Sequence, residues 1–131
     1  MSNQRIEFLG QLDERSLRPF SRVVKAGGMV YVSGHSAPHD PEQGIHRGGT
    51  PAEEVRNALT FIATLLEEAG SRLDLVVQVT MLISSRKDYA ALNAEYIKHF
   101  PNGLPARHTV LFGVPTDARV GVACVALQSG N

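Results

Sequence analysis

Two helical patterns separated by one strand pattern constrain the fold of this 131-residue chain most strongly. The first helix is predicted from Thr50 to Gly70. Thr50 suits the N-cap, Pro51 suits the first helical position, and Glu53 completes a capping box. Gly70 favours a C-terminal stop. The apolar residues that recur at helical spacing are Val55, Leu59, Ile62, Leu66 and Ala69.

A strand and a second helix are predicted to follow. The apolar run from Leu75 to Ile83 predicts a strand that is buried on much of both faces. Ser85 is expected to cap the second helix, with Asp88 three residues later, and Pro101-Asn102-Gly103 is expected to end it. The inner stripe of this helix is predicted to consist of Tyr89, Leu92, Tyr96 and Phe100.

Further strands are predicted before and after this helical part. The segment from Arg5 to Phe20 alternates weakly and predicts an edge strand, and Gly27-Gly28 predicts a tight hairpin turn. A long loop, 34–49, follows the hairpin, and its role stays open at this point. The remaining predicted strands are Val23–Val24, Met29–Ser33, Ala106–Gly113 and Val120–Leu127.

This order predicts one α+β domain over residues 1–131, with a mixed sheet and two helices packed on one face. Strands that are separated by a helix need crossover connections, so part of the sheet is expected to pair in parallel. Two helices cover only one face of such a sheet. We therefore expect the other face to pack against another copy of the chain.

Composition narrows the classes of partner. Thirteen basic and thirteen acidic residues give a net charge of zero, which argues against nucleic acid or an anionic membrane surface as a partner. The single cysteine, Cys124, lies in an apolar run and is expected to be a core residue in a reducing compartment. The chain contains neither a signal-peptide pattern nor an apolar stretch long enough to span a membrane, so we expect a cytoplasmic location.

Arg107 is the first candidate for a ligand-binding residue. It stands after Pro105-Ala106 and just before the apolar run Val110-Leu111-Phe112, at the start of a predicted buried strand. A guanidinium at the edge of a core is costly unless it holds an anion, and its planar fork suits a carboxylate. The alternative is a structural salt bridge with one of the chain's own thirteen acidic residues.

Other common types of site have little support in the sequence. Three of the five histidines, His35, His39 and His46, lie with Asp40 in the loop after the hairpin, but they lack a metal-ligand spacing. We therefore expect neither a metal nor another cofactor. Ser33-Gly34-His35 lacks the flanking glycine and the strand-to-helix context of a nucleophile elbow.

Four motifs occur in the order and spacing of one family. They are Pro19 to Val24, Tyr31 to His35, Leu92 to Tyr96, and Leu104 to Arg107. With the predicted helices between them, the chain resembles the Rid family of YjgF-like enamine/imine deaminases from Pro19 to Leu127. Some members of this family are described as endoribonucleases or translation inhibitors.

The resemblance implies a chorismate-mutase-like fold and a homotrimer with sites in clefts between subunits. In the family, the arginine of the Pro-Ala-Arg motif binds the carboxylate of a 2-imino or 2-aminoacrylate type of substrate, and Arg107 occupies that position. Ser33 and Gly34 match the strand residues that line the cleft. Asn93 matches the asparagine of the second helix, and Thr109 replaces a common cysteine.

Two departures put the family's hydrolytic chemistry in question. Phe20 stands where deaminating members carry a tyrosine, and Gly121 stands where they carry the glutamate that orients water. Arg22 also replaces a frequent glutamine. Since the usual acid is missing, no catalytic residue is assigned. His35, Glu95 and a carboxylate from a neighbouring subunit are possible replacements that only their nearness to a motif favours.

Three hypotheses remain from the sequence. The first is a divergent enamine/imine deaminase, or a related hydrolase, that acts on a small carboxylated C=N compound. The second is a non-catalytic trimeric protein that binds small carboxylates. The third is an endoribonuclease, which the neutral charge and the lack of a basic, aromatic-lined track disfavour.

Overall fold

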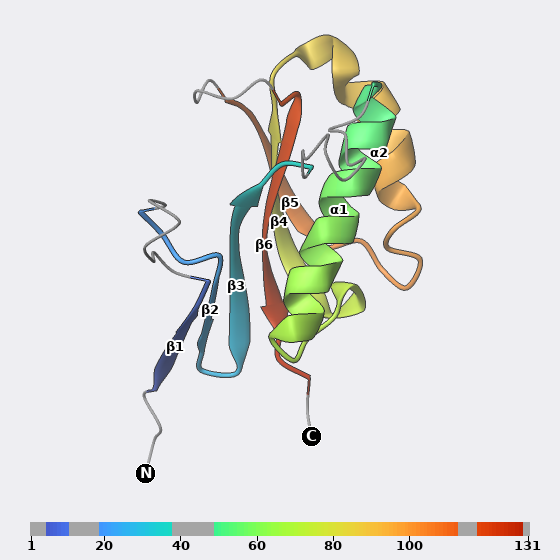
Figure 1. Cartoon of the computed structure of the whole chain (residues 1–131). Helices are drawn as coiled ribbons and strands as arrows, with labels where there is room; N and C mark the ends of the chain where they lie inside the picture. Colours follow the sequence, from blue (N-terminus) through green and yellow to red (C-terminus); the bar gives the residue numbers. More distant parts are fainter. Residues whose placement is uncertain (1–4, 11–18, 38–48, 113–117, 130–131) are drawn as a thin grey trace.

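In the computed structural model, six strands form one mixed sheet and two helices lie on one of its faces (Figure 1). The strand order is β1-β2-β3-β6-β4-β5. The structure describes residues 5–10, 19–37, 49–112 and 118–129. This architecture confirms the predicted α+β class and the placement of both helices on one side.

The order and pairing of the strands agree with the prediction. β4 and β5 pair in parallel, as the crossover argument predicts, and the other neighbours are antiparallel. The β2–β3 hairpin turns at Gly27 and Gly28, whose φ angles of 58° and 78° suit glycine. The strand bounds are Ile6–Leu9 for β1, Val23–Ala26 for β2, Met29–His35 for β3, Val76–Ile83 for β4, Ala106–Leu111 for β5 and Val120–Leu127 for β6.

Helix α1, Pro51–Glu68, begins as the sequence predicts. The Thr50 hydroxyl accepts a hydrogen bond from the Glu53 N–H at 3.1 Å, and the Glu53 carboxylate accepts one from the Thr50 N–H at 3.0 Å. Gly70 follows the last turn with a φ of 81°, a left-handed conformation that favours glycine. All five residues of the predicted apolar stripe are buried.

The start of the second helix differs from the prediction. Ser85 caps a short 3₁₀ turn, η3 (Arg86–Asp88), because its hydroxyl accepts a hydrogen bond from the Lys87 N–H. Helix α2, Tyr89–Ile97, begins only after this turn. A second 3₁₀ turn, η2 (Leu73–Leu75), precedes β4, so the predicted strand start at Leu75 is one residue early.

Two strands are less buried than predicted. In β4 the residues facing the helices are buried, whereas Gln78, Thr80 and Leu82 on the other face are half-buried. β5 is an edge strand that alternates between exposed and half-buried residues, and its described part ends at Leu111. Apolar composition predicted burial in both cases, but a strand needs both cover on its two faces and neighbours on its two edges to be fully buried.

The core lies between the helices and the sheet. Leu59, Ile62 and Leu66 of α1 and Leu92 of α2 are fully buried there, and each contributes on the order of 1.5–3 kcal/mol to folding. Cys124 of β6 is a core residue, as predicted, and burial raises the pKa of its thiol to about 12. In the described ranges, neither helix has the length and apolar character that crossing a membrane requires.

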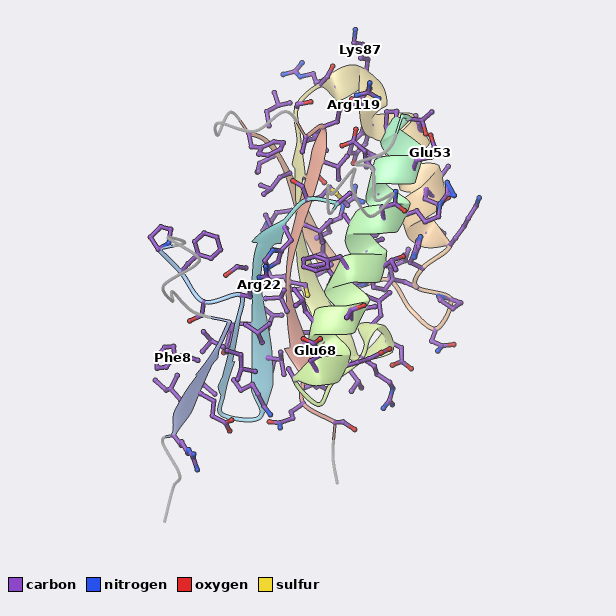
Figure 2. All side chains as sticks on the ribbon, viewed as in Figure 1. Phe8, Arg22, Glu53, Glu68, Lys87 and Arg119 are labelled. Carbon is purple, nitrogen blue, oxygen red and sulfur yellow. The ribbon has the colours of Figure 1, made fainter. Side chains whose placement is uncertain are left out.

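The face of the sheet away from the helices remains apolar and open. Phe8 of β1 is 54% exposed and projects on the side opposite α1 and α2 (Figure 2). Phe8 is the pairing partner of Val24 in β2, and Val24 is the pairing partner of Tyr31 in β3, which is 45% exposed. Val110 and Leu127 are also large exposed apolar residues. This open face is the surface for which the sequence predicts a second copy of the chain.

Candidate active site around Arg107

Arg107 lies on the edge strand β5, on the same face of the sheet as the helices. It pairs with Val79 of β4, whose side chain is buried in the core. Successive strand residues point to opposite faces, so Arg107 and Thr109 share the helix side while His108 points to the open side. The Arg107 side chain therefore emerges half-buried beside α2.

Neutral groups hold the guanidinium. Its Nη2 atom donates to Asn93 Oδ1 at 2.8 Å and to the Tyr89 hydroxyl at 3.4 Å. Its carbon lies 4.7 Å from the centre of the Tyr96 ring and 5.7 Å from that of Tyr89, within cation–π range. In the described ranges, no carboxylate lies within 4.0 Å of this guanidinium. These contacts orient the positive charge without neutralising it.

One face of α2 supplies these contacts. Tyr89, Asn93 and Tyr96 recur at spacings of four and three residues, so they line one side of the helix above β5. Tyr96 is buried, and its hydroxyl finds no hydrogen-bond partner among the described residues. Burial raises the pKa of Tyr96. Hydrogen bonds with Asn93 and Arg107, together with the Arg107 charge, lower the pKa of the exposed Tyr89 phenol.

Two depressions flank the arginine. The larger, of about 510 Å³, is lined by Ile83, Arg86, Tyr89, Thr109, Val110 and Leu111. The smaller, of about 250 Å³, is lined by Asn93, Tyr96, Ile97, Leu104, Pro105 and Arg107. The smaller one combines mainly apolar walls with one guanidinium, which suits a small molecule that carries one carboxylate.

The structure brings together three of the five predicted binding residues. Arg107, Asn93 and Thr109 lie on adjoining parts of β5 and α2. Ser33 and Gly34 lie on β3, three strands away in the sheet order, which at roughly 4.8 Å per strand is about 14 Å. The Ser33 hydroxyl also donates to the Ser21 carbonyl at 2.7 Å. One chain alone therefore does not join both groups.

The two positions where the family residues are missing also lie away from Arg107. Gly121 pairs with Leu82, whose side chain lies on the open face, whereas Arg107 lies on the helix face. Phe20 is exposed and comes just before β2, which lies towards the opposite end of the strand order from β5. Neither position reaches the guanidinium within one chain.

The candidate replacements for the missing acid make other contacts. Glu95 accepts a hydrogen bond from His99 at 2.8 Å, which lowers the pKa of its carboxyl, and it lies 3.7 Å from the Arg56 guanidinium. It follows Asn93 by two residues, so it lies roughly 200° around α2 from the Arg107 side. His35 packs edge-on against Phe61 of α1, with 5.4 Å between ring centres.

The sequence predicts that the loop histidines do not form a metal site. His39, Asp40 and His46 lie outside the described residues, as does most of the loop 34–49. Within the described ranges, no group of three or more potential metal ligands is assembled.

Sequence reasoning did not identify the tyrosines and the second arginine as site residues. Tyr89 and Tyr96 were assigned to the inner stripe of the helix, yet Tyr89 is 45% exposed and contacts Arg107. The signal was their helical spacing to Asn93, a residue already matched to the family cleft. Arg86 carries no comparable signal, because only the turn η3 brings it to the larger depression.

Comparisons with known proteins agree with this architecture. The model of the endoribonuclease L-PSP family matches residues 12–128. Protein mmf2 of Schizosaccharomyces pombe is 33% identical over 114 residues, which cover 84% of this chain and 88% of the relative.

Solved structures match over most of their length as well. A YjgF family protein from Neisseria meningitidis has a TM-score of 0.82 and 25% identity, covering 98% of both chains. The Rid family protein YyfA from Yersinia pestis has a TM-score of 0.76 and 27% identity, covering 86% of this chain and 90% of its own. The chain thus belongs to the endoribonuclease L-PSP family, the YjgF or Rid proteins that its four motifs resemble.

Proposed function

We propose that this protein binds a small carboxylate at Arg107 and hydrolyses an imine or enamine that carries it. The observation that carries the proposal is the state of Arg107. Asn93 and Tyr89 hold its guanidinium with neutral oxygens, and open depressions lie beside it. A positive charge that is fixed but not neutralised is suited to an external anion with two oxygens.

The reaction needs little apparatus beyond such an anchor. Imines hydrolyse readily in water, so a protein that binds and orients one gains rate from positioning alone. In this chain the glutamate that orients water in related deaminases is replaced by Gly121. We therefore expect slow turnover of simple 2-imino acids.

The proposed site requires a second copy of the chain. Arg107 lies on the helix face at one edge, whereas Ser33, Gly34 and Gly121 lie on other strands. The large apolar residues of the open face, Phe8 and Tyr31 among them, favour packing of one sheet against another. We propose the homotrimer of the family resemblance, with the Arg107 half of one subunit facing the Gly121 half of its neighbour.

A non-catalytic carboxylate-binding trimer is the second candidate, and Gly121 is the observation that favours it. Such a protein would keep the anchor and bind without turnover. The ribonuclease activity in the family's description is less well supported here, since the net charge is zero. A cytoplasmic location remains part of the proposal, while the S. pombe relative is described as mitochondrial.

Titration of pyruvate, a keto acid of the proposed product class, tests the anchor by calorimetry. Arg107→Ala should weaken binding by about 2–4 kcal/mol, as for a lost charge-assisted bidentate contact. Arg107→Lys should recover only part, because an ammonium lacks the fork geometry. Arg72→Ala is the matched control, since Arg72 is an exposed arginine paired with Asp74 at 2.6 Å.

Two results would contradict the proposal. If both Arg107 variants bind pyruvate as well as the parent, the residue does not hold the ligand. If both variants unfold while Arg72→Ala remains folded, Arg107 is structural.

Activity is followed by generating the imine with an amino-acid oxidase and trapping the remaining imine with semicarbazide, so that faster hydrolysis leaves less trapped product.

A further inference from the structure

The Tyr89 phenol occupies a position that the proposed anchor does not itself explain. It is 45% exposed at the start of α2 and lines the larger depression together with Thr109 and Arg86. Its oxygen lies 3.4 Å from Arg107 Nη2, at the long limit of a hydrogen bond. Arg107 is the donor in this contact, so the Tyr89 hydroxyl does not use its own proton in it.

We propose that Tyr89 recognises the substituent on the α-carbon of the ligand. Its O–H donates a hydrogen bond to the keto oxygen, or to the neutral imine nitrogen, next to the carboxylate held by Arg107. The inference rests on the proposed function and narrows it. A site built in this way selects α-keto and α-imino acids over carboxylates that have no acceptor at the α-carbon.

Covalent distances support this reach. The α-carbon is bonded directly to the carboxyl carbon. The keto oxygen or imine nitrogen on the α-carbon therefore lies about 3 Å from the nearer carboxylate oxygen, a separation similar to the length of a hydrogen bond. When Arg107 grips that carboxylate, the α-substituent comes close to a group that already touches the guanidinium. Tyr96, the other phenol beside Arg107, lines the smaller depression with Arg107 but is buried, whereas Tyr89 is exposed and lines the larger one.

The groups around Tyr89 favour its role as a donor. Arg107 approaches from β5 and Arg86 from η3, and both are cationic. Asn93 and Thr109 are neutral, and Asp88 is the preceding residue in the chain. Hydrogen bonds with Asn93 and Arg107 and the Arg107 charge lower the pKa of the phenol, which makes the neutral form a stronger hydrogen-bond donor.

A pair of ligands tests the inference by calorimetry, without requiring turnover. Pyruvate carries an α-keto oxygen, whereas propionate has the same carbon chain and no α-acceptor. Tyr89→Phe should weaken pyruvate binding about three- to tenfold, the size of one hydrogen bond, and leave propionate binding unchanged. Thr60→Val, which likewise removes one hydroxyl but from the exposed side of α1, should leave both affinities unchanged.

The pH dependence provides a second readout. The phenol donates below its pKa, so the affinity of the parent for pyruvate should fall as pH rises from neutrality towards 10.0, the ordinary value for tyrosine. Tyr89→Phe should lack this fall, because Arg107 keeps its charge throughout that range.

The outcomes separate this inference from the proposed function. If Tyr89→Phe weakens both ligands equally, or neither, the α-carbon role of Tyr89 is wrong while the Arg107 anchor stands. If the parent binds neither ligand, the proposed function is overturned and this inference with it. A parent that prefers pyruvate, with the preference lost only in Tyr89→Phe, supports both.

Discussion

The two halves of the proposed site differ in what one chain provides. Around Arg107, α2 and β5 supply an amide, two phenols and open space. Around Gly121, the open face supplies mainly hydrocarbon: a Cβ atom at Gly121 would lie 3.3 Å from Leu82 Cδ1, and one at Gly34 would lie 3.5 Å from the same atom.

This difference separates recognition from chemistry. The anchor proposed to bind a carboxylate is assembled within one subunit, since Asn93 and the tyrosines already orient Arg107. The half that carries the water-orienting acid in related deaminases has a glycine packed beside leucine. We infer that this protein retains carboxylate binding and that its hydrolysis of imines depends on groups that orient water less well than the glutamate of related deaminases. The predictions below change one half at a time.

The largest expected effect comes from giving the Gly121 half an acid. Gly121→Glu should raise the hydrolysis rate of 2-iminopropionate by about 10²-fold, since a positioned general base contributes roughly 10²–10⁴-fold. The backbone at Gly121 has no positive φ. Gly121 is buried, and a Cβ there would lie 3.3 Å from Leu82 Cδ1 and 3.5 Å from Leu82 Cβ, so the Leu82 side chain must shift and the variant is first shown to be folded and assembled.

Gly121→Gln is the matched control, because it adds nearly the same volume without a carboxylate. The semicarbazide assay should show a gain for the glutamate variant only. Equal rates for the two variants, both folded, would mean that the pocket has been rebuilt for another ligand. A parent already as fast as ordinary deaminating relatives would mean that another residue replaces the acid.

A smaller effect should follow from neutralising the Arg107 half. Asn93→Asp keeps the shape of the side chain but places a carboxylate where the amide oxygen lies 2.8 Å from Arg107. The ligand must then displace an internal ion pair, and a charge-assisted hydrogen bond of about 1.5–3 kcal/mol corresponds to a ten- to hundredfold loss of pyruvate affinity.

Thermal unfolding of Asn93→Asp is measured alongside, since an ion pair between the new aspartate and Arg107 should not lower the melting temperature. Gln128→Glu, which adds the same charge at an exposed position after β6, is the control. Unchanged pyruvate affinity in Asn93→Asp would show that the ligand does not use the guanidinium.

Local patterns in the sequence predicted most of the fold. The α1 cap at Thr50 and the hairpin turn at Gly27-Gly28 depend on residues that interact within a few positions of one another, and both are confirmed. The exposure of β5 was not predicted, because it follows from the position of this strand at the edge of the sheet. Strand order is set by long-range pairing that apolar periodicity does not encode.

The candidate site was predictable to a similar extent. Arg107 and Asn93 were identified from motifs, and the 2.8 Å contact between them agrees with a shared role. Tyr89 was assigned to the helix interior because its spacing to Leu92 fits an apolar stripe. The 3₁₀ turn η3 delays the start of α2, so Tyr89 begins the helix at the rim of a depression instead of within the core.

Mixed assemblies test most directly whether one site is built from two chains. Parent chains carry the anchor but no acid, and chains with both Arg107→Ala and Gly121→Glu carry the acid but no anchor. When the two are co-expressed with different tags and purified as mixed assemblies, the account predicts fast 2-iminopropionate hydrolysis, since Arg107 of one subunit meets the new acid of its neighbour. Activity equal to the sum of the two separate proteins, with Gly121→Glu alone shown to be fast, would contradict the shared site.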